Sequence, residues 1–554
     1  MSAAATMATS GAQADEFDYV IVGAGSAGCV VANRLSASGN QRVLLLEAGG
    51  TDRRVFVQLP VGYGRLLFDP RINWMYETEP VPALGGRRSF WPRGKLIGGS
   101  GSINAMVYVR GQAQDFDDWA ALGNPGWAYR DVLPYFLQSE DHATLSNEYH
   151  RRGGPMQVTD VSNGVHPLCQ AFVAASQELG WSATADFNGA MGEGVGVYQI
   201  NTRNGRRASS ANEFLRPALR RPNLVLRSRA QVTRVLFGGR RATGVQYVRS
   251  GQRLTVSARR GVILCAGAIN SPQLLQLSGV GAPEVLRPLG MEVLADLPAV
   301  GRNLQDHLAV SYVYRSKRAT LNDELYPLAG KLKAAWTYLR HRTGPLSMSV
   351  NQGGGFVRSD AGLSAPNLQL YFNPVSYTKT PLADRKLLSP DPFSAFILAF
   401  NACRPTSRGW LKITSPDPLQ APTIQPNYLA TDQDVADAMA GCRVLRRLAA
   451  SAPLARIIDT ELEPGAAARS DAELLADFRA RSDTVFHPVS TCCMGSDTRS
   501  SVVDARLRVH GLSGLRIIDA SVFPTITSGN TNAPTVMVAE KGAAMVIEDE
   551  REPG

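Results

Sequence analysis

Three glycines and one glutamate near the start of the chain have the types and spacing of a dinucleotide-binding site. Gly23 permits a tight turn, Gly25 lets the backbone approach a pyrophosphate, and Gly28 lets a helix pack closely on the preceding strand. Glu47 follows about 20 residues later, where its carboxylate can accept a hydrogen bond from a ribose hydroxyl. The alternative is a glycine-rich turn without a ligand. Together the four residues predict a dinucleotide-binding site.

The segments around these residues have the patterns of the elements that must position them. The apolar run 17–22 is typical of a buried parallel strand, and a helical stretch follows the glycines. The N–H groups at the start of that helix would face the phosphates. A second apolar run, 42–46, ends at Glu47 and predicts the neighbouring strand.

Parts of the same pattern return later in the chain. Residues 261–268 repeat the strand and the glycine turn. Pro272 is expected at the first position of a helix that ends at Leu277, because its missing N–H would be unpaired there anyway. Another strand-like run, 515–519, ends in Asp519. Pieces of one nucleotide-binding fold therefore lie near the start, the middle and the end of the chain, so we expect a second domain to be inserted into the first.

The expected insert contains strand-like stretches at 367–373 and 393–400 and a helical stretch at 432–449, which indicates a sheet backed by helices. The predicted fold class is α/β, with a discontinuous Rossmann-like domain and an inserted α+β substrate-binding domain. The expected division is a disordered tail at 1–16, a dinucleotide-binding domain at 17–310 and 480–550, and a substrate-binding domain at 311–479.

Length, composition and charge limit the class of protein. A chain of 554 residues is too long for one core, and a composition of 44% hydrophobic and 19% charged residues is typical of a soluble globular protein.

The net charge is +10, but the arginines are scattered rather than clustered, which argues against a nucleic-acid partner. The remaining explanations are the compositional bias of the coding genome and a weak attraction to an anionic membrane surface. Seven cysteines without a CxxC motif argue against disulfides or a structural zinc and fit a reducing cytoplasm, with at most peripheral membrane contact.

Two longer motifs, at 94–108 and 267–281, resemble the signatures of the glucose-methanol-choline (GMC) family of flavoprotein oxidoreductases. The segments 486–488 and 529–535 resemble the catalytic region of that family. The resemblance covers about 17–547 and is strongest to the bacterial choline dehydrogenase-like and aliphatic alcohol dehydrogenases. Relatives often have Gly and Arg where this chain has Ser490 and Cys493.

The resemblance implies that the dinucleotide is FAD, with Gly23, Gly25, Gly28 and Glu47 holding its ADP half. Some relatives bond the flavin covalently to a histidine; the corresponding residue here is Ile103, which implies non-covalent FAD. Small residues let the backbone reach a planar ring. The further residues implied to contact the cofactor are Gly98, Gly99, Asn104 and Val107 at the flavin, Val232 at the adenine, Asp519 and Ala520 at the ribityl–phosphate region, and Thr531 and Asn532 at the flavin pyrimidine edge.

Alcohol oxidation removes a proton from O–H and a hydride from C–H, and flavin N5 takes the hydride. His487 is the expected general base, because imidazole is basic yet largely unprotonated near neutral pH, and Pro488 holds the backbone before it extended. The resemblance gives Asn530 as its catalytic partner, whose amide can donate to the developing alkoxide. Residues after Asn530 are expected to start a helix at about 534–546, whose N-terminus would stabilise negative charge on reduced flavin. His307 is expected to be structural.

The sequence therefore predicts an FAD-dependent oxidation of a primary alcohol to an aldehyde, with electrons passed to a quinone or another carrier. The alternatives are an oxidase that makes hydrogen peroxide and a non-redox lyase of the same fold; a light-driven decarboxylase fits poorly with His487 and Asn530. Residues 351–355 and the loop 374–392 are candidates for the wall and lid of the substrate pocket. Cys492 and Cys493 are expected to be buried structural thiols, and His142 is expected on the surface.

Overall fold

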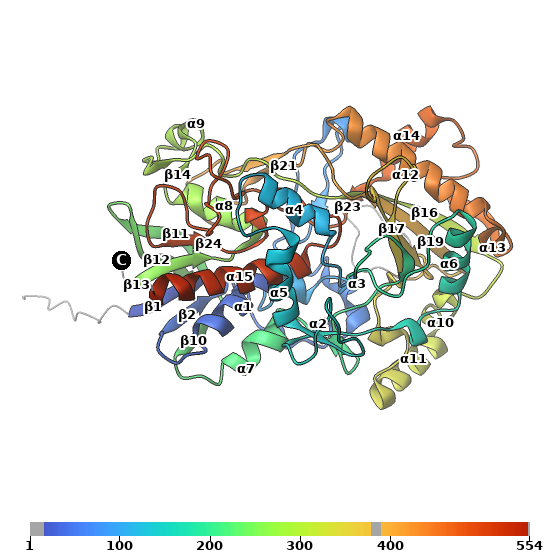
Figure 1. Ribbon diagram of the computed structural model, residues 1–554, viewed down its shortest axis with the longest axis horizontal. Helices are drawn as coiled ribbons and strands as arrows, with labels where there is room; N and C mark the ends of the chain where they lie inside the picture. Colours follow the sequence, from blue (N-terminus) through green and yellow to red (C-terminus); the bar gives the residue numbers. More distant parts are fainter. Residues whose placement is uncertain (1–15, 378–388, 552–554) are drawn as a thin grey trace, which may run out of the picture.

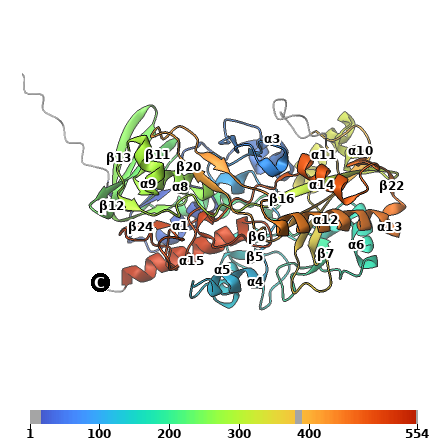
Figure 2. The ribbon, with the colours of Figure 1, turned by 90° about the horizontal axis from the view of Figure 1, so that it is seen from above.

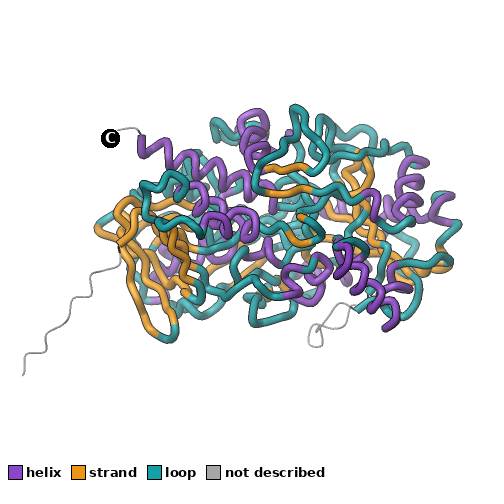
Figure 3. Tube along the Cα trace, turned by 90° about the horizontal axis from the view of Figure 1, so that it is seen from below, coloured by secondary structure: helices purple, strands orange, loops and turns teal. Residues whose placement is uncertain are grey.

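The computed structural model describes residues 16–377 and 389–551, and it contains two large sheets at opposite ends of the molecule (Figure 1). Figure 3 shows the corresponding strand-rich regions, with loops and helices between them. Residues 1–15 of the predicted tail and most of the predicted lid lie outside the described residues. Glu16, assigned to the tail, instead starts the first strand, where it pairs with Ser257.

The first sheet has the order β10-β2-β1-β13-β12-β11, with β24 added beside β13. Its parallel part brings distant segments together, since Ile21 of β1 lies opposite both Leu45 of β2 and Ile263 of β13. The antiparallel part carries the β11–β12–β13 meander. The predicted α/β fold class is thus confirmed, and the first sheet is built from segments at the start, middle and end of the chain. Its strands are β1 (Glu16–Val22), β2 (Val43–Leu46), β10 (Leu224–Arg227), β11 (Ala230–Gly238), β12 (Arg241–Arg249), β13 (Gln252–Leu264) and β24 (Leu515–Ile517).

Two helices from opposite ends of the sequence pack together beside this sheet. α1 (Ser26–Leu35) contacts α15 (Asn532–Arg551), which runs from the left side of the molecule toward its centre in Figure 1. Arg34 of α1 donates to the fully buried Glu540 of α15 with an N–O distance of 2.6 Å. The N-termini of the two helices also meet, because the Ser26 hydroxyl donates to Asn532 Oδ1 at 2.8 Å.

Pro272 lies inside α8 (Gly267–Leu277), so the prediction that it starts the helix is wrong. A proline inside a helix cannot donate to the carbonyl four residues earlier, here that of Ala268. The Thr491 hydroxyl donates to that carbonyl at 2.6 Å. The cost of the lost helical bond is therefore offset by a contact from a segment more than two hundred residues away.

The second sheet has the order β22-β16-β19-β18-β17-β7, with β23 beside β16. As predicted, helices back it: α12 (Asp432–Ala450) packs on β19, and α14 (Asp471–Arg481) packs on β16 (Figure 2). Two of its strands, β7 and β23, lie outside 311–479, so the sheet also draws on segments assigned to the other domain. The domain boundaries themselves stay a prediction. The strands are β7 (Gly194–Val197), β16 (Leu308–Ser316), β17 (Gly353–Val357), β18 (Leu368–Asn373), β19 (Ala395–Ala402), β22 (Ile458–Glu463) and β23 (Asp483–Thr484).

Among the helices in the described part of the chain, none is both long enough and apolar enough to cross a bilayer.

Candidate active site

A cavity of about 700 Å³ is lined by residues of both sheets, from β1, β2 and β11 at one end to β16, β18 and β19 at the other. Its size is typical of a small-molecule or cofactor site. Among the predicted site residues, Gly28 and Gly98 are the two that do not line it. Those that do are Gly23, Gly25, Glu47, Gly99, Asn104, Val107, Val232, His487, Asp519, Ala520, Asn530, Thr531 and Asn532.

The glycine turn has the geometry that a dinucleotide requires. Gly23 has φ of +97°, and a Cβ on Gly28 would lie 1.9 Å from the Gly23 carbonyl oxygen, so Gly28 serves the packing of helix on strand. Gly25 precedes α1, and no side chain caps this helix. Ser26 and Ala27 of its first turn line the cavity, so the helix N-terminus faces a space in which a pyrophosphate fits.

Glu47 follows β2, as predicted, and its side chain lies on the cavity wall. Its two carboxylate oxygens accept hydrogen bonds from the Ala24 N–H at 2.9 Å and the Gly49 N–H at 2.7 Å. Each oxygen keeps a further lone pair for a ribose hydroxyl. Burial raises the pKa of Glu47, and the two backbone donors lower it, so that the pKa is about 7 overall.

Asp519 joins two turns at the centre of the cavity wall. One carboxylate oxygen accepts from the Gly267 N–H at 2.8 Å and the Ser271 hydroxyl at 2.6 Å, at the start of α8. The other accepts from the N–H and hydroxyl of Ser521, at 2.8 and 2.6 Å. Asp519 therefore aligns the turn after β13 with the turn after β24, and its neighbour Ala520 lines the cavity.

The first signature motif folds as a tight loop against the start of α1. A Cβ on Gly99 would lie 2.8 Å from Gly25 Cα, and one on Gly98 would lie 2.0 Å from the Ser102 hydroxyl. Ile103 lines the cavity, and the structure places no nucleophilic atom at that position.

Arg207 is a site residue that the sequence analysis missed. It is buried, and its Nη1 donates to Asn104 Oδ1 at 2.7 Å, which holds the Asn104 side chain beside the cavity. Burial lowers the pKa of Arg207 to about 9. Arg207 belongs to the pair Arg206-Arg207, one of many arginine pairs in the sequence. Nothing in the neighbouring sequence distinguishes it from the arginines of the other pairs.

At the other end of the cavity, His487 and Asn530 come together as predicted. The Asn530 amide Nδ2 lies 3.1 Å from His487 Nε2, and Gln369 of β18 donates to Asn530 Oδ1 at 3.2 Å. The Gln369 contact orients the Asn530 amide so that its N–H groups face the histidine. Gln369 has no signal in the sequence beyond its place in a strand.

His307 decides which nitrogen of His487 carries the proton. His307 Nε2 lies 2.9 Å from the Cys403 carbonyl oxygen, which can only accept, so this nitrogen is protonated. His307 Nδ1 then has a lone pair, and His487 Nδ1–H donates to it at 3.0 Å. His487 Nε2 is left as an acceptor facing Asn530 and the cavity. His307 therefore positions and prepares the expected base, beyond the structural role that the sequence analysis assigned to it.

The backbone around His487 is also held. Asp306 Oδ1 accepts from the His487 N–H at 2.7 Å, and Asp306 Oδ2 accepts from the hydroxyls of Thr484 and Tyr428. Arg93 donates to the Phe486 carbonyl at 2.7 Å, and Phe486 has φ of +69°, which is uncommon for a non-glycine residue. These contacts stabilise a strained turn that places His487 on the cavity wall.

Burial keeps both histidines neutral. It lowers the pKa of His487 well below its usual value, and the neighbouring His307 and Arg93 lower it further. Burial lowers the pKa of His307 to about 4. An unprotonated imidazole is therefore available at neutral pH and below.

Cys492 and Cys493 are buried and form no disulfide, as predicted. Burial raises the pKa of Cys493 to about 11 and that of Cys492 well above the ordinary thiol value, so neither is a thiolate at neutral pH. Ser490 has φ of +74°, a conformation that favours glycine.

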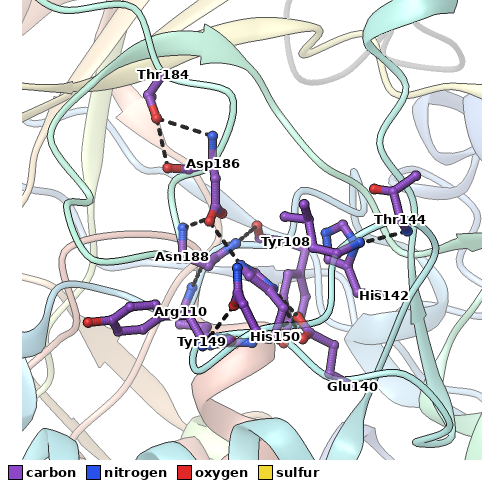
Figure 4. A network of polar contacts seen from close by, with 12 residues as sticks. Tyr108, Arg110, Glu140, His142, Thr144, Tyr149, His150, Thr184, Asp186 and Asn188 are labelled. Carbon is purple, nitrogen blue, oxygen red and sulfur yellow. Dashed lines mark hydrogen bonds and ion pairs between the residues drawn. The ribbon is translucent and has the colours of Figure 1, made fainter.

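His142 is buried, so its predicted place on the surface is wrong. It packs edge-on against His150, inside a polar network that does not line the cavity (Figure 4). His150 lies between Glu140, at 3.1 Å, and Asp186, at 2.9 Å. Burial alone would lower the pKa of His150, but hydrogen bonds to the two carboxylates raise it overall. Arg110 donates to Glu140 at 2.8 Å, so the network anchors the segment that follows cavity residue Val107.

Known proteins resemble this chain over most of its length. Family models described as GMC oxidoreductase match residues 17–309 and 405–539. The chain is 43% identical to mitochondrial choline dehydrogenase of Mus musculus, over 96% of the chain and 89% of the relative. It is 41% identical to the alcohol dehydrogenase [acceptor] of Pseudomonas putida, over 96% of both. The crystal structure of pyridoxine 4-oxidase from Mesorbium loti superposes with a TM-score of 0.86 at 32% identity, covering 96% of the chain and 99% of that structure.

Proposed function

The chain belongs to the GMC oxidoreductase family, and on that premise we propose that it oxidises a primary alcohol to an aldehyde and passes the electrons to a quinone or another carrier. Its cofactor is FAD, for which the uncapped start of α1, Glu47 and the loop around Gly99 form a fitting site. FAD supplies the hydride acceptor. The observation that carries the proposal is the hydrogen-bond chain from the Cys403 carbonyl to His487, which leaves His487 Nε2 unprotonated.

The two polar groups at this end of the cavity have complementary tasks. His487 Nε2 accepts the hydroxyl proton of the alcohol, and the amide of Asn530 donates to the oxygen as negative charge develops there. Gln369 keeps the Asn530 amide in the donating orientation. Both histidines are buried, and an alcohol that displaces water from the cavity would strengthen these interactions further.

The cavity favours an uncharged alcohol. Among the described lining residues the carboxylates are Glu47, Glu463, Asp483 and Asp519, and each already has partners within the protein. The second sheet lines the cavity with the uncharged side chains of Ala309, Tyr371 and Ala399. The charged lining residue Arg93 is close enough to lower the pKa of His487, and its positive charge would repel a cationic substrate. A cationic substrate would lose hydration without gaining a free carboxylate.

We therefore expect uncharged primary alcohols to reduce the bound flavin faster than choline does. The measurement is anaerobic stopped-flow reduction with choline and a series of uncharged primary alcohols, compared by kcat/KM. A higher kcat/KM for choline than for every uncharged alcohol would contradict the proposed substrate class. Absence of bleaching with every alcohol would instead favour the lyase alternative.

The reduced enzyme is expected to pass electrons to an artificial quinone much faster than to oxygen. Phe486 lines the cavity beside His487, and we expect its bulky ring to restrict the approach of oxygen. The enzyme is reduced anaerobically with a good alcohol and mixed with either quinone or air-saturated buffer. Equal reoxidation rates with stoichiometric hydrogen peroxide would establish the oxidase alternative.

Denaturation is expected to release the flavin completely. A covalent histidyl link needs a nucleophilic ring nitrogen, and the corresponding residue is the apolar Ile103. The protein is precipitated with acid, washed, and examined for flavin absorbance in the pellet and the supernatant. Flavin that stays with the polypeptide after washing would show a covalent bond elsewhere.

A further inference from the structure

One helix presents its apolar side chains to solvent. In α11 (Leu328–His341) four large side chains are well exposed, namely Leu328 at 73%, Leu332 at 63%, Trp336 at 69% and Leu339 at 68%. Single exposed apolar residues are normal, but a contiguous group marks an interaction surface. At about 100° per residue the four lie within a sector of about 80° on the helix. We define these four residues as the α11 stripe.

The face of α11 that packs on the protein is small and lies opposite the stripe. Ala334 and Tyr338 are its only buried residues. Figure 1 shows α11 at the lower right edge of the molecule, projecting beyond the second sheet. The stripe is therefore unpartnered in the described part of the chain, and it is convex rather than a groove.

Cations flank the stripe on both sides. Lys331 lies on one side, and Lys333 and Arg340 lie on the other, all exposed. The sequence of α11 contains no acidic residue. An apolar face bordered by lysine and arginine is the pattern of a helix that lies in the interface of a lipid bilayer, with its cations at the level of anionic headgroups.

We propose that the α11 stripe docks the protein on an anionic lipid surface. The charge of the flanks selects this occupant over a second copy of the chain, because two such helices would bring like charges together. The bilayer interface also accepts a convex helix without a complementary pocket. Trp336, at the edge of the stripe, has the amphipathic ring that favours this interface.

Short segments connect the α11 stripe with the wall of the cavity. α11 leads through the turn η7 (Pro345–Ser347) to Asn351, which lines the cavity. The preceding helix α10 (Leu321–Leu325) is tied by the Asn322 side chain to the backbone of Ser376, close to cavity residue Asn373. The surface and the cavity are thus joined by short, hydrogen-bonded segments.

The test is flotation of the full-length FAD-loaded protein with phosphatidylcholine vesicles, with and without phosphatidylglycerol. We expect binding to the anionic vesicles, weakened about tenfold or more by the double substitution Leu332→Ser/Trp336→Ser and also weakened by Lys333→Gln/Arg340→Gln. The matched control is Leu122→Ser/Met191→Ser, which removes two exposed apolar side chains elsewhere and should bind like the wild type. Added salt should weaken binding, because it screens the cations.

Equal flotation of the wild type and Leu332→Ser/Trp336→Ser would overturn the proposal. So would a wild type that self-associates without lipid, in sedimentation equilibrium, while this variant stays monomeric, since the occupant would then be a second copy. No residue of α11 lines the cavity, so alcohol-dependent flavin reduction in solution should be unchanged in the variants. Failure of docking is therefore distinguishable from failure of the proposed function.

Discussion

His487→Ala is expected to retain FAD but to lose about 10²–10⁴-fold in the rate of alcohol-dependent flavin reduction. In the proposed mechanism His487 Nε2 accepts the hydroxyl proton. The imidazole does not contribute to the glycine turn, Glu47 or Asp519, which are proposed to hold the other parts of the cofactor. The rate is measured by anaerobic stopped-flow reduction, and FAD content by the visible spectrum. His341→Ala, an exposed histidine outside the cavity, is the control and should react like the wild type.

The pH dependence of the same reaction separates this base from an ordinary exposed histidine. Burial lowers the pKa of His487, so the neutral form persists as the pH falls below 6.5 and is lost only near the lower pKa of the folded protein. We therefore expect the rate of flavin reduction to stay level through pH 6.5 and to fall at lower pH. A fall centred at pH 6.5 or above, or a variant His487→Ala within about threefold of the wild type, would place the base elsewhere.

His307→Phe is expected to slow flavin reduction about tenfold or more while leaving FAD bound. Phenylalanine keeps a planar ring but has no acceptor for His487 Nδ1–H, so the proton of His487 is free to move to Nε2, where it blocks the base. The Cys403 carbonyl also loses its donor. The rate constant and KM are measured separately, and the loss is expected in the rate constant.

The conservative change His307→Asn distinguishes positioning from structural support. The Asn carbonyl oxygen takes a place near that of His307 Nδ1 and can accept from His487. We expect His307→Asn to recover most of the activity lost in His307→Phe. If both variants lose the same activity, or if neither loses any, the proton on His487 is set by another group.

The sequence was most informative where each residue acts locally. Gly23 and Gly28 are needed for a turn and for a close helix contact within one strand–turn–helix segment, so their spacing alone indicated the fold. Glu47 follows the next strand at the expected position. Pro272 was placed wrongly because the lost helical hydrogen bond to the Ala268 carbonyl is replaced by one from the Thr491 hydroxyl. Thr491 belongs to a distant segment, which local propensity cannot detect.

Residues that act through distant partners were misjudged or missed. His142 was expected on the surface, yet a network drawn from separate segments of the chain buries it (Figure 4). Gln369 and Arg207 orient Asn530 and Asn104, but each is an ordinary strand or loop residue in the sequence. A polar side chain far along the chain becomes a partner only when the strands have been brought together.

The glycines and Glu47 predicted a dinucleotide site from the sequence alone, and the resemblance to a family indicated His487 and Asn530. The nitrogen of His487 that is free to act as the base could be identified only from the three-dimensional arrangement. That choice depends on the Cys403 carbonyl and on His307, which reach His487 from other segments of the chain. Tautomers are set by the distances and directions of hydrogen bonds in space, which residue types and spacings along the chain do not specify.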